Sequence, residues 1–269
     1  RGTDPDIYKE RKNLGRALVP QILKAIDFDL KNTVFSYIPN TAETAYYGMI
    51  EGLEDYLSAK RKEILIEGKP HLDDLGELLN FRPRVEKLVS KDVKLRTFIT
   101  NDSVRGTTIE KSVLTTLDKL EPKRIIIVSS APQIRFPDCY GIDMSRMKDF
   151  IAFRAAVQLI EDKDGMDNLL ERVYDKCVAN PESDENYVKE IYAPFTDQEI
   201  SDKIASIITS ENIKAGVHVI YQTVDNLHSS CPGHSGDWYF TGNFPTKGGI
   251  RVVKKAFVNY MEGKEERAY

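Results

Sequence analysis

A short, wholly apolar run near the middle of the chain limits the fold more than any other feature of the sequence. Residues 124–128 include three consecutive isoleucines, and turn-forming residues lie on both sides of the run. A short apolar run between turn signals is typical of a parallel strand with both faces buried. Such a strand needs helices over both faces of its sheet, so the run predicts an α/β protein.

Strand-like and helical segments alternate around this run. Residues 33–38 and 94–99 have strand-like patterns, whereas residues 43–57 and 107–120 carry apolar side chains at helical spacing. This order predicts a parallel sheet flanked by helices. Ligands of such sheets bind at the carboxyl ends of the strands.

The chain changes character after residues 180–184, whose sequence Asn-Pro-Glu-Ser-Asp is the best linker candidate. We therefore predict one domain over residues 1–179 and a C-terminal α+β extension over residues 180–269, packed on it. Within the extension, residues 196–208 begin with a capping box and predict a helix, and residues 217–224 predict a strand.

Composition and charge exclude several classes of protein. The 269 residues are 41% hydrophobic and 30% charged, which is enough apolar material for a compact core. A net charge of -4 argues against a nucleic-acid partner, because binding the phosphate backbone depends on a basic surface. No apolar run reaches the length of a membrane span, and three widely spaced cysteines fit a reducing compartment. We expect a cytoplasmic protein without a membrane partner, truncated at its front.

A glycine turn in the predicted domain has the chemistry of a phosphate-binding loop. Arg105, Gly106, Thr107 and Thr108 open a predicted helix. The glycine allows close backbone approach, the threonine hydroxyls donate hydrogen bonds, and a helix N-terminus presents unpaired N–H groups to an anion. A capped helix after an ordinary turn has the same pattern, so these residues alone leave both interpretations open.

Four blocks in order along the chain resemble successive signatures of amidophosphoribosyltransferases. The blocks are residues 95–99, 104–108, 129–137 and 140–144. The resemblance implies the parallel sheet of a type I phosphoribosyltransferase. It also implies a glycosyltransferase that makes 5-phosphoribosylamine from phosphoribosyl pyrophosphate and glutamine-derived ammonia, the first step of purine nucleotide synthesis.

The resemblance also implies roles for particular residues. Residues 105–108 would hold the ribose 5-phosphate, and Pro39, Asn40 and Thr41 match the family's pyrophosphate loop. Arg96 would lie in a mobile loop that closes over the substrate, as a catalytic residue. Its guanidinium suits a leaving pyrophosphate, whose negative charge grows as the glycosidic bond breaks.

Several partners follow from the same resemblance. They are Mg²⁺, phosphoribosyl pyrophosphate, purine nucleotides as feedback inhibitors, and further copies of the chain in a homo-oligomer. The family draws its ammonia from glutamine through an N-terminal glutaminase domain. We expect that domain to lie outside this sequence.

The sequence departs from the family pattern just before the phosphate loop. The family places a hydrophobic strand and two adjacent aspartates there, whereas this sequence has Asp102 alone. Either the catalytic acids have been lost, or further residues of the natural chain separate Ser103 from Val104. We favour the second explanation, because losing a central strand would remove hydrogen bonds and buried surface that no neighbour replaces.

Two other functions are weighed against the transferase. The lone acid favours a non-catalytic sensor of phosphoribosyl pyrophosphate or a nucleotide, with the same fold. Another type I phosphoribosyltransferase that loads a nucleobase is the third hypothesis, and the match over residues 140–143 argues against it.

No protein metal site is expected. Four ligand-type residues recur at every third position, but glycine and proline between them indicate an irregular loop. They are His228, Cys231, His234 and Asp237. Cys139 is one position away from the family's iron–sulfur cysteine, and Gly236 and Tyr239 replace a terminal cysteine pair, so the chain resembles the members without a cluster.

Overall fold

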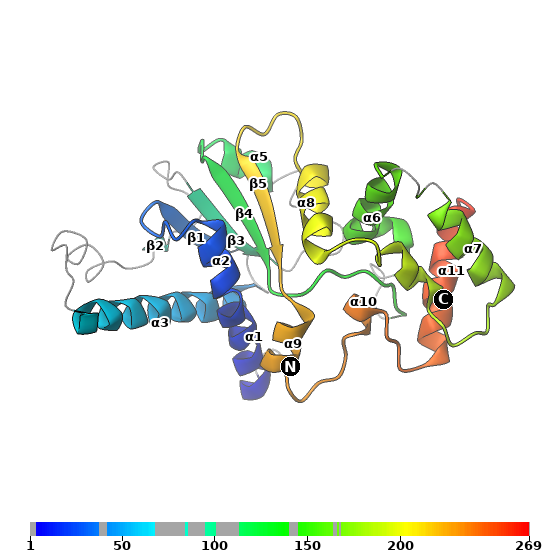
Figure 1. Cartoon of the computed structure of the whole chain (residues 1–269), viewed down its shortest axis with the longest axis horizontal. Helices are drawn as coiled ribbons and strands as arrows, with labels where there is room; N and C mark the ends of the chain where they lie inside the picture. The colour runs from blue at the N-terminus through cyan, green and yellow to red at the C-terminus, as the bar shows by residue number, and fades with distance from the viewer. Residues whose placement is uncertain are drawn as a thin grey trace. The chain divides into compact units, whose positions relative to one another are not determined.

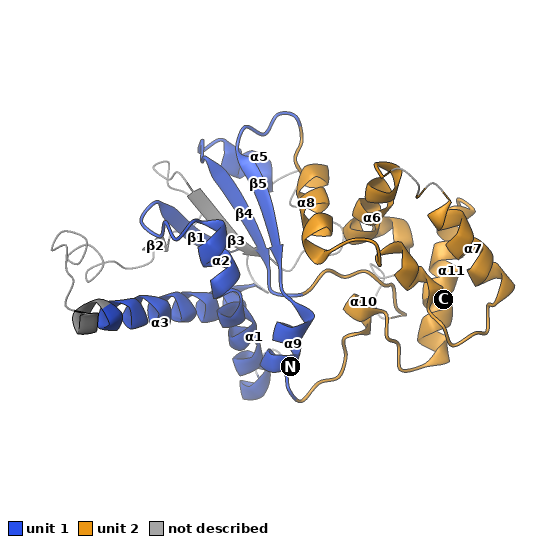
Figure 2. Cartoon of the chain, in the orientation of Figure 1, with its two compact units in different colours: residues 1–101, 113–131, 211–232 blue, residues 102–112, 132–210, 233–269 orange. Residues whose placement is uncertain are grey.

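The computed structural model describes residues 4–37, 42–67, 84–85, 95–100, 113–139, 145–163, 166 and 168–268, and side chains except at 64–67, 84–85 and 95–100. The chain forms two compact units (Figure 2). Unit 1 consists of residues 1–101, 113–131 and 211–232, and unit 2 of residues 102–112, 132–210 and 233–269. The structure thus divides the chain differently from the expected boundary between residues 179 and 180.

Unit 1 is built around a parallel five-stranded sheet (Figure 1). The strands are β1 (Thr33–Tyr37), β2 (Arg84–Val85), β3 (Leu95–Thr100), β4 (Arg124–Ser129) and β5 (Gly216–Tyr221). Their order is β2-β1-β3-β4-β5, and every neighbouring pair is parallel. The predicted α/β class with a parallel sheet is confirmed.

Helices of unit 1 connect the strands or flank them. They are α1 (Pro5–Ala17), α2 (Val19–Ala25), α3 (Glu43–Glu67), α5 (Thr115–Asp118) and α9 (Val224–Ser230). The side chain of Asp4 accepts a hydrogen bond from the Asp6 amide and so caps α1, whose first residue is a proline. Both features are favourable at a helix start.

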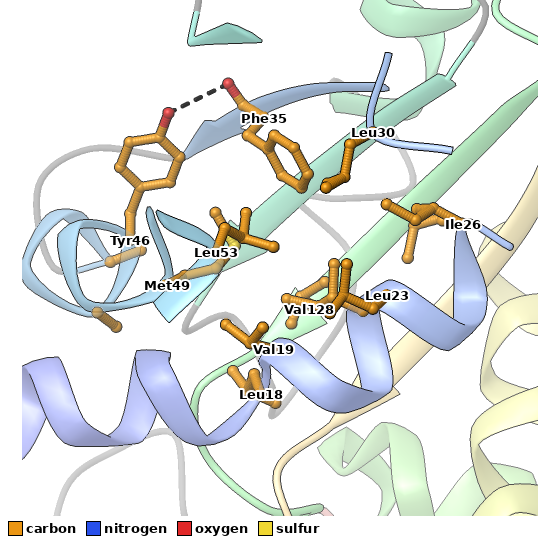
Figure 3. Packing of buried hydrophobic residues seen from close by; sticks show 14 of the residues in the cluster. Leu18, Val19, Leu23, Ile26, Leu30, Phe35, Tyr46, Met49, Leu53 and Val128 are labelled. Atoms are coloured by element: carbon orange, nitrogen blue, oxygen red, sulfur yellow. Dashed lines mark hydrogen bonds between the residues drawn. The ribbon is translucent and has the colours of Figure 1, made fainter. Parts of the chain in front are cut away.

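The hydrophobic core of unit 1 lies between the sheet and helices α2 and α3 (Figure 3). Ile126 and Val128 of β4 belong to this cluster, and Ile125 and Ile127, which alternate with them, are also no more than 2% exposed. Successive side chains of a strand point to opposite faces. Both faces of β4 are therefore buried, as the isoleucine run predicts.

Glycines let α1 and α3 approach each other closely. A β-carbon on Gly48 of α3 would lie 1.9 Å from the Lys12 carbonyl oxygen of α1. Lys12 and Glu51 form an ion pair beside this crossing, and Arg16 Nη2 lies 3.2 Å from Glu51 Oε2. This packing fixes the position of the first turns of α3, the helix that follows β1 along the chain.

The described part of unit 2 is helical. Its elements are the 3-10 turns η3 (Met147–Asp149) and η4 (Tyr187–Ile191) and the helices α6 (Ile151–Glu161), α7 (Leu169–Ala179), α8 (Asp197–Ile208), α10 (Trp238–Thr241) and α11 (Lys247–Met261). The capping box of α8 is confirmed, with Thr196 as its N-cap and Glu199 as the reciprocal partner. The strand predicted at residues 217–224 is β5, which pairs with β4 in the sheet of unit 1.

The predicted linker at residues 180–184 is a packed turn. Lys254 Nζ of α11 donates hydrogen bonds to the carbonyl oxygens of Asn180 at 2.9 Å and Ser183 at 2.7 Å. The same ammonium lies 5.0 Å from the ring centre of Tyr187, and Lys254 is only 3% exposed. Two carbonyl oxygens and an aromatic face compensate a buried charge that would otherwise be costly.

Among the described residues, no helix combines the length and the apolar character that a membrane crossing requires.

Candidate functional site

The strand order of unit 1 marks one crevice as the preferred place for a ligand. The chain leaves β1 to form β2 on one side of it and then returns to form β3 on the other side. In open parallel sheets, ligands bind at the carboxyl ends of the strands where the order reverses, and an order of 2-1-3-4-5 places that point between β1 and β3.

The two predicted phosphate-binding segments follow these two strands. Tyr37 at the end of β1 pairs with Ile99 of β3, so both strands end at the same edge of the sheet. Pro39, Asn40 and Thr41 come directly after β1. Residues 105–108 come after β3. These seven residues lie outside the described part of the chain, so their predicted contacts with phosphates stay predictions.

Arg96 lies in a strand. It is the second residue of β3, where it pairs with Val34 on one side and Ile125 on the other. Thr100 ends the strand four residues later, which corresponds to about 13 Å at ~3.3 Å per residue. The backbone of Arg96 is thus held in a hydrogen-bonded ladder away from the carboxyl edge, and its expected location in a mobile loop is wrong. Its catalytic role stays a prediction.

At the same edge of the sheet, hydrogen bonds hold the described residues at the ends of β4 and β5 in place. Ser129 Oγ donates to the Ala131 carbonyl oxygen at 2.9 Å, and the Gln222 amide donates to the Ser129 carbonyl oxygen at 3.2 Å. Gln222 is 3% exposed, and its Nε2 donates to the Leu14 carbonyl oxygen of α1 at 2.8 Å. These bonds join both strand ends to α1 and satisfy groups that would be costly to bury unpaired.

Three side chains cluster where β1 passes into α3. The hydroxyls of Tyr37, at 3.2 Å, and Tyr47, at 2.7 Å, both donate to Oε1 of Glu43. The hydrogen bond to Glu43 raises the pKa of Tyr47 to about 12, because the phenol must stay protonated to donate. The neighbouring Tyr46 is buried and donates instead to the Phe35 carbonyl oxygen at 3.2 Å (Figure 3). No motif in the sequence indicates this cluster.

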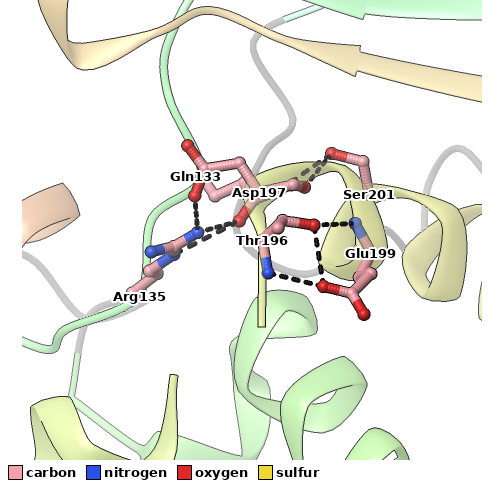
Figure 4. A network of polar contacts seen from close by, with 6 residues as sticks. All are labelled: Gln133, Arg135, Thr196, Asp197, Glu199 and Ser201. Atoms are coloured by element: carbon pink, nitrogen blue, oxygen red, sulfur yellow. Dashed lines mark hydrogen bonds and ion pairs between the residues drawn. The ribbon is translucent and has the colours of Figure 1, made fainter. Parts of the chain in front are cut away.

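The segment that follows the sheet, residues 129–137, continues into unit 2 and is anchored there to α8 (Figure 4). Gln133 Nε2 donates to the Asp197 carbonyl oxygen at 2.7 Å and to Ser201 Oγ at 2.8 Å. Arg135 Nη2 donates to Gln133 Oε1 at 2.7 Å and pairs with the Asp197 carboxylate. The guanidinium also lies 5.4 Å from the ring centre of Tyr192. These groups fix the backbone of the segment.

Further bonds hold the next residues of this segment. The amides of Arg135 and Phe136 both donate to the Tyr239 carbonyl oxygen, and Trp238 Nε1 donates to Asp138 Oδ2 at 2.9 Å. The neighbouring thiol of Cys139 is exposed, and the Asp138 carboxylate raises its pKa. A raised pKa favours the thiol form, which is a poor nucleophile and metal ligand.

Binding of the expected Mg²⁺ stays a prediction, because the segments expected to lie beside the substrate's phosphates are outside the described residues. Mg²⁺ usually binds through one or two carboxylates together with substrate phosphates. At the β1–α3 connection, Glu43 supplies a carboxylate, but its Oε1 already accepts two tyrosine hydroxyls. Within the described part of the chain, no group of three or more His, Cys, Asp or Glu residues could hold a metal ion.

Comparisons with known proteins bear on the resemblance. No family model matches the chain. A protein of Lachancea kluyveri is 26% identical over 183 residues, which are 64% of this chain and 34% of that protein. A protein of Pseudomonas aeruginosa is 28% identical over 173 residues, 61% of this chain and 33% of the relative. A protein of Haemophilus influenzae is 39% identical over 67 residues, 25% of this chain and 13% of its own length. Each is named amidophosphoribosyltransferase.

The resemblance to amidophosphoribosyltransferases is confirmed. The chain spans about a third of the length of the first two amidophosphoribosyltransferases. A solved glutamine phosphoribosylpyrophosphate amidotransferase from B. subtilis, complexed with ADP and GMP, is 19% identical, with a TM-score of 0.45 over 91% of this chain and 45% of the other.

Proposed function

We propose that this chain is the phosphoribosyl-pyrophosphate-binding part of an amidophosphoribosyltransferase. In the proposed reaction, the nitrogen of ammonia forms a bond to C1 of the ribose and the bond from C1 to pyrophosphate breaks. The nitrogen then loses a proton, and the products are 5-phosphoribosylamine and pyrophosphate. Glutamine is the proposed source of the ammonia, through a domain outside this sequence.

One observation carries the proposal. The segment that matches the family's pyrophosphate loop follows β1, and the segment that matches its phosphate loop follows the neighbouring strand β3. A substrate with a 5-phosphate and a pyrophosphate on one ribose needs two anion-binding loops at one edge of the sheet. In open parallel sheets of this strand order, ligands bind at the switch point between β1 and β3, and this supports the proposal.

The proposed catalysis depends mainly on position and electrostatics. Backbone N–H groups at a helix start would hold the 5-phosphate, and donors near the pyrophosphate would stabilise the charge that it gains as it leaves. Mg²⁺, feedback inhibition by purine nucleotides, a homo-oligomer and a cytoplasmic location remain parts of this proposal. Arg96 is retained in it as a catalytic candidate.

The sequence between β3 and the phosphate loop favours a second candidate. Asp102 is the single acid among residues 95–108, where the family pattern has an adjacent pair. A protein without that pair would bind phosphoribosyl pyrophosphate without transferring it and would act as a sensor. Peptide mapping of the natural protein over residues 95–108 tests this point, because a peptide that joins Ser103 directly to Val104 would show that the acid pair is absent.

Calorimetry and an assay of pyrophosphate release separate the candidates. The transferase predicts that the chain binds phosphoribosyl pyrophosphate and releases pyrophosphate when ammonia is added. Gly106→Val should abolish binding, because a side chain there blocks backbone approach to the phosphate. Gly233→Val is the matched control, since no atom lies within 4 Å of a β-carbon built there. Binding without release would establish the sensor, and no binding would exclude both.

A further inference from the structure

A cavity of about 500 Å³ in unit 2 is lined by residues 184–190 and by residues 242–250, which lead into α11. We propose that this cavity binds a small organic cation, in which an ammonium group is carried on an apolar body. Both segments belong to unit 2, so the whole cavity lies within one compact unit (Figure 2). The proposal goes beyond the proposed function and does not depend on it.

The wall of the cavity includes a buried acceptor without a donor. Asn186 lines the cavity and is 8% exposed. Its Nδ2 donates to the Gly242 carbonyl oxygen at 3.0 Å, and this bond distinguishes the nitrogen of the amide from its oxygen. The buried Oδ1 accepts no hydrogen bond from a described residue. An acceptor buried without a donor costs free energy, so an N–H group of a ligand would be stabilised at this oxygen.

The charge of the wall favours a cation over an anion. Three acidic residues line the cavity, Asp184, Glu185 and Glu190, whereas Lys189 is the one basic residue among the described residues of the wall. The ammonium of Lys189 is already engaged, because its Nζ donates to Asn243 Oδ1 at 2.7 Å. A ligand in the cavity therefore meets a negative field, which attracts a positive group.

One of the three carboxylates is free to pair with that group. Asp184 Oδ1 lies 2.9 Å from Lys247 Nζ, and Glu190 Oε1 lies 2.8 Å from Lys176 Nζ, so both of these acids have cationic partners. The Glu185 carboxylate makes neither an ion pair nor a hydrogen bond within the described part of the chain. Glu185 and the adjacent Asn186 thus present two unused acceptors to one ammonium group.

The remaining wall suits an apolar body. Phe244 and Ile250 line the cavity. The Phe244 side chain packs directly on the first turn of α11, where a β-carbon on Gly249 would lie 2.3 Å from the ring. An aromatic face binds both apolar groups and organic cations. A metal ion fits less well, because the described residues contain no group of three or more His, Cys, Asp or Glu that could hold one.

The test is an NMR titration of the whole chain with 2-phenylethylamine, which is protonated at neutral pH. The neutral 2-phenylethanol has nearly the same size and the same apolar body, so it is the matched control ligand. The amine should bind saturably and about tenfold more tightly than the alcohol, because a charged donor makes the stronger hydrogen bond. Chemical shifts should change at the side-chain amide of Asn186 and at the backbone amide of Gly242.

Two variants assign the binding to the two acceptors. Glu185→Gln should weaken the affinity for the amine by about threefold and leave that for the alcohol unchanged. Glu171→Gln is its control, since it changes the charge equally on α7, outside the cavity. Asn186→Ala should weaken the affinity for the amine by about fivefold. This variant also loses the bond to Gly242, so Glu185→Gln decides the matter if it does not fold.

Four outcomes would overturn the proposal. The first is the lack of a saturable shift with the amine up to about 10 mM, which would mean that water alone serves the buried oxygen. The others are equal affinities for amine and alcohol, shifts confined to residues outside the cavity, and an equal loss of affinity in Glu185→Gln and Glu171→Gln.

Discussion

Gly15 of α1 faces the backbone of Ala45 in α3, and a β-carbon on Gly15 would lie 1.7 Å from the Ala45 carbonyl oxygen. The obstacle is backbone rather than a flexible side chain, so the helices must separate to admit even a methyl group. The first residues of α3 follow the predicted pyrophosphate loop along the chain. Adding one β-carbon at Gly15 would therefore displace the start of this helix.

We expect Gly15→Ala to destabilise unit 1 by about 1–3 kcal/mol. The free-energy penalty of overpacking this contact should exceed the gain from the higher helix propensity of alanine. Thermal unfolding measures the effect. Gly248→Ala is the control, since a β-carbon there meets only Thr246 Oγ1 at 3.9 Å and should be neutral or slightly stabilising. Equal melting temperatures for the two variants would contradict the close approach.

Gln133→Leu should destabilise unit 2 by about 1–3 kcal/mol, because it removes the acceptor of the Arg135 guanidinium and a donor to α8 from a buried place. Urea unfolding of unit 2 checks this, with Gln198→Leu as the control. Gln198 is exposed, and its Nε2 donates to Asp202 Oδ1 of the same helix at 2.8 Å. A loss of stability in the control as large as in Gln133→Leu would show that the network does not hold the segment.

The capping box of α8 predicts a pH dependence. Hydrogen bonds from the Thr196 amide and hydroxyl lower the pKa of Glu199 below its usual 4.5. A pKa that is lower in the folded state means that the ionised carboxylate favours folding. Its contribution is present above about pH 4.5 and is lost as the pH falls through the lower folded-state value. The gap in melting temperature between wild type and Glu199→Gln should therefore close in acid.

Thr196→Val provides the comparison, because it removes the hydroxyl that donates to Glu199 Oε2 at 2.8 Å. In that background, Glu199→Gln should change the melting temperature less than it does in the wild type. A gap for Glu199→Gln that persists at low pH would assign the stabilisation to something other than the carboxylate charge.

Glu43→Gln should lower the pKa of Tyr47 from about 12 towards the ordinary value of 10, because the amide accepts the phenol proton less strongly than a carboxylate. Tyrosinate absorbance is titrated for each protein with and without the additional change Tyr47→Phe, and the difference between the two curves gives the titration of Tyr47 alone. An unchanged Tyr47 pKa in Glu43→Gln would mean that the shared carboxylate oxygen is not the cause of the shift.

Local signals in the sequence predicted much of the fold. The isoleucine run identified β4, and the Thr196–Glu199 pair identified the start of α8, because both patterns act within a few residues. The sheet membership of β5 was missed, since the pairing of Val128 with Ile220 joins distant parts of the chain. Nothing near residue 220 distinguishes a strand of this sheet from one of a separate extension.

The candidate site was predicted by resemblance more than by local pattern. The loop position expected for Arg96 was wrong because hydrogen bonds to β1 and β4 hold it in the sheet. The Tyr37–Glu43–Tyr47 cluster was not predicted from the sequence, because tyrosine is common at strand ends and glutamate is common on helix surfaces. Their common oxygen appears only when strand and helix are placed in three dimensions.

The division of unit 1 into separate chain segments affects the order in which the protein can fold during synthesis. After β4 has left the ribosome, residues 132–210 must be made before β5 arrives to cover its edge. At typical translation speeds this interval is on the order of ten seconds, far longer than a collapse of the nascent chain requires. Throughout it, the backbone N–H and C=O groups on the β5 side of β4 lack their native partner and can pair with a neighbouring nascent chain. Slower initiation, which spaces ribosomes further apart, should therefore increase the yield of soluble protein.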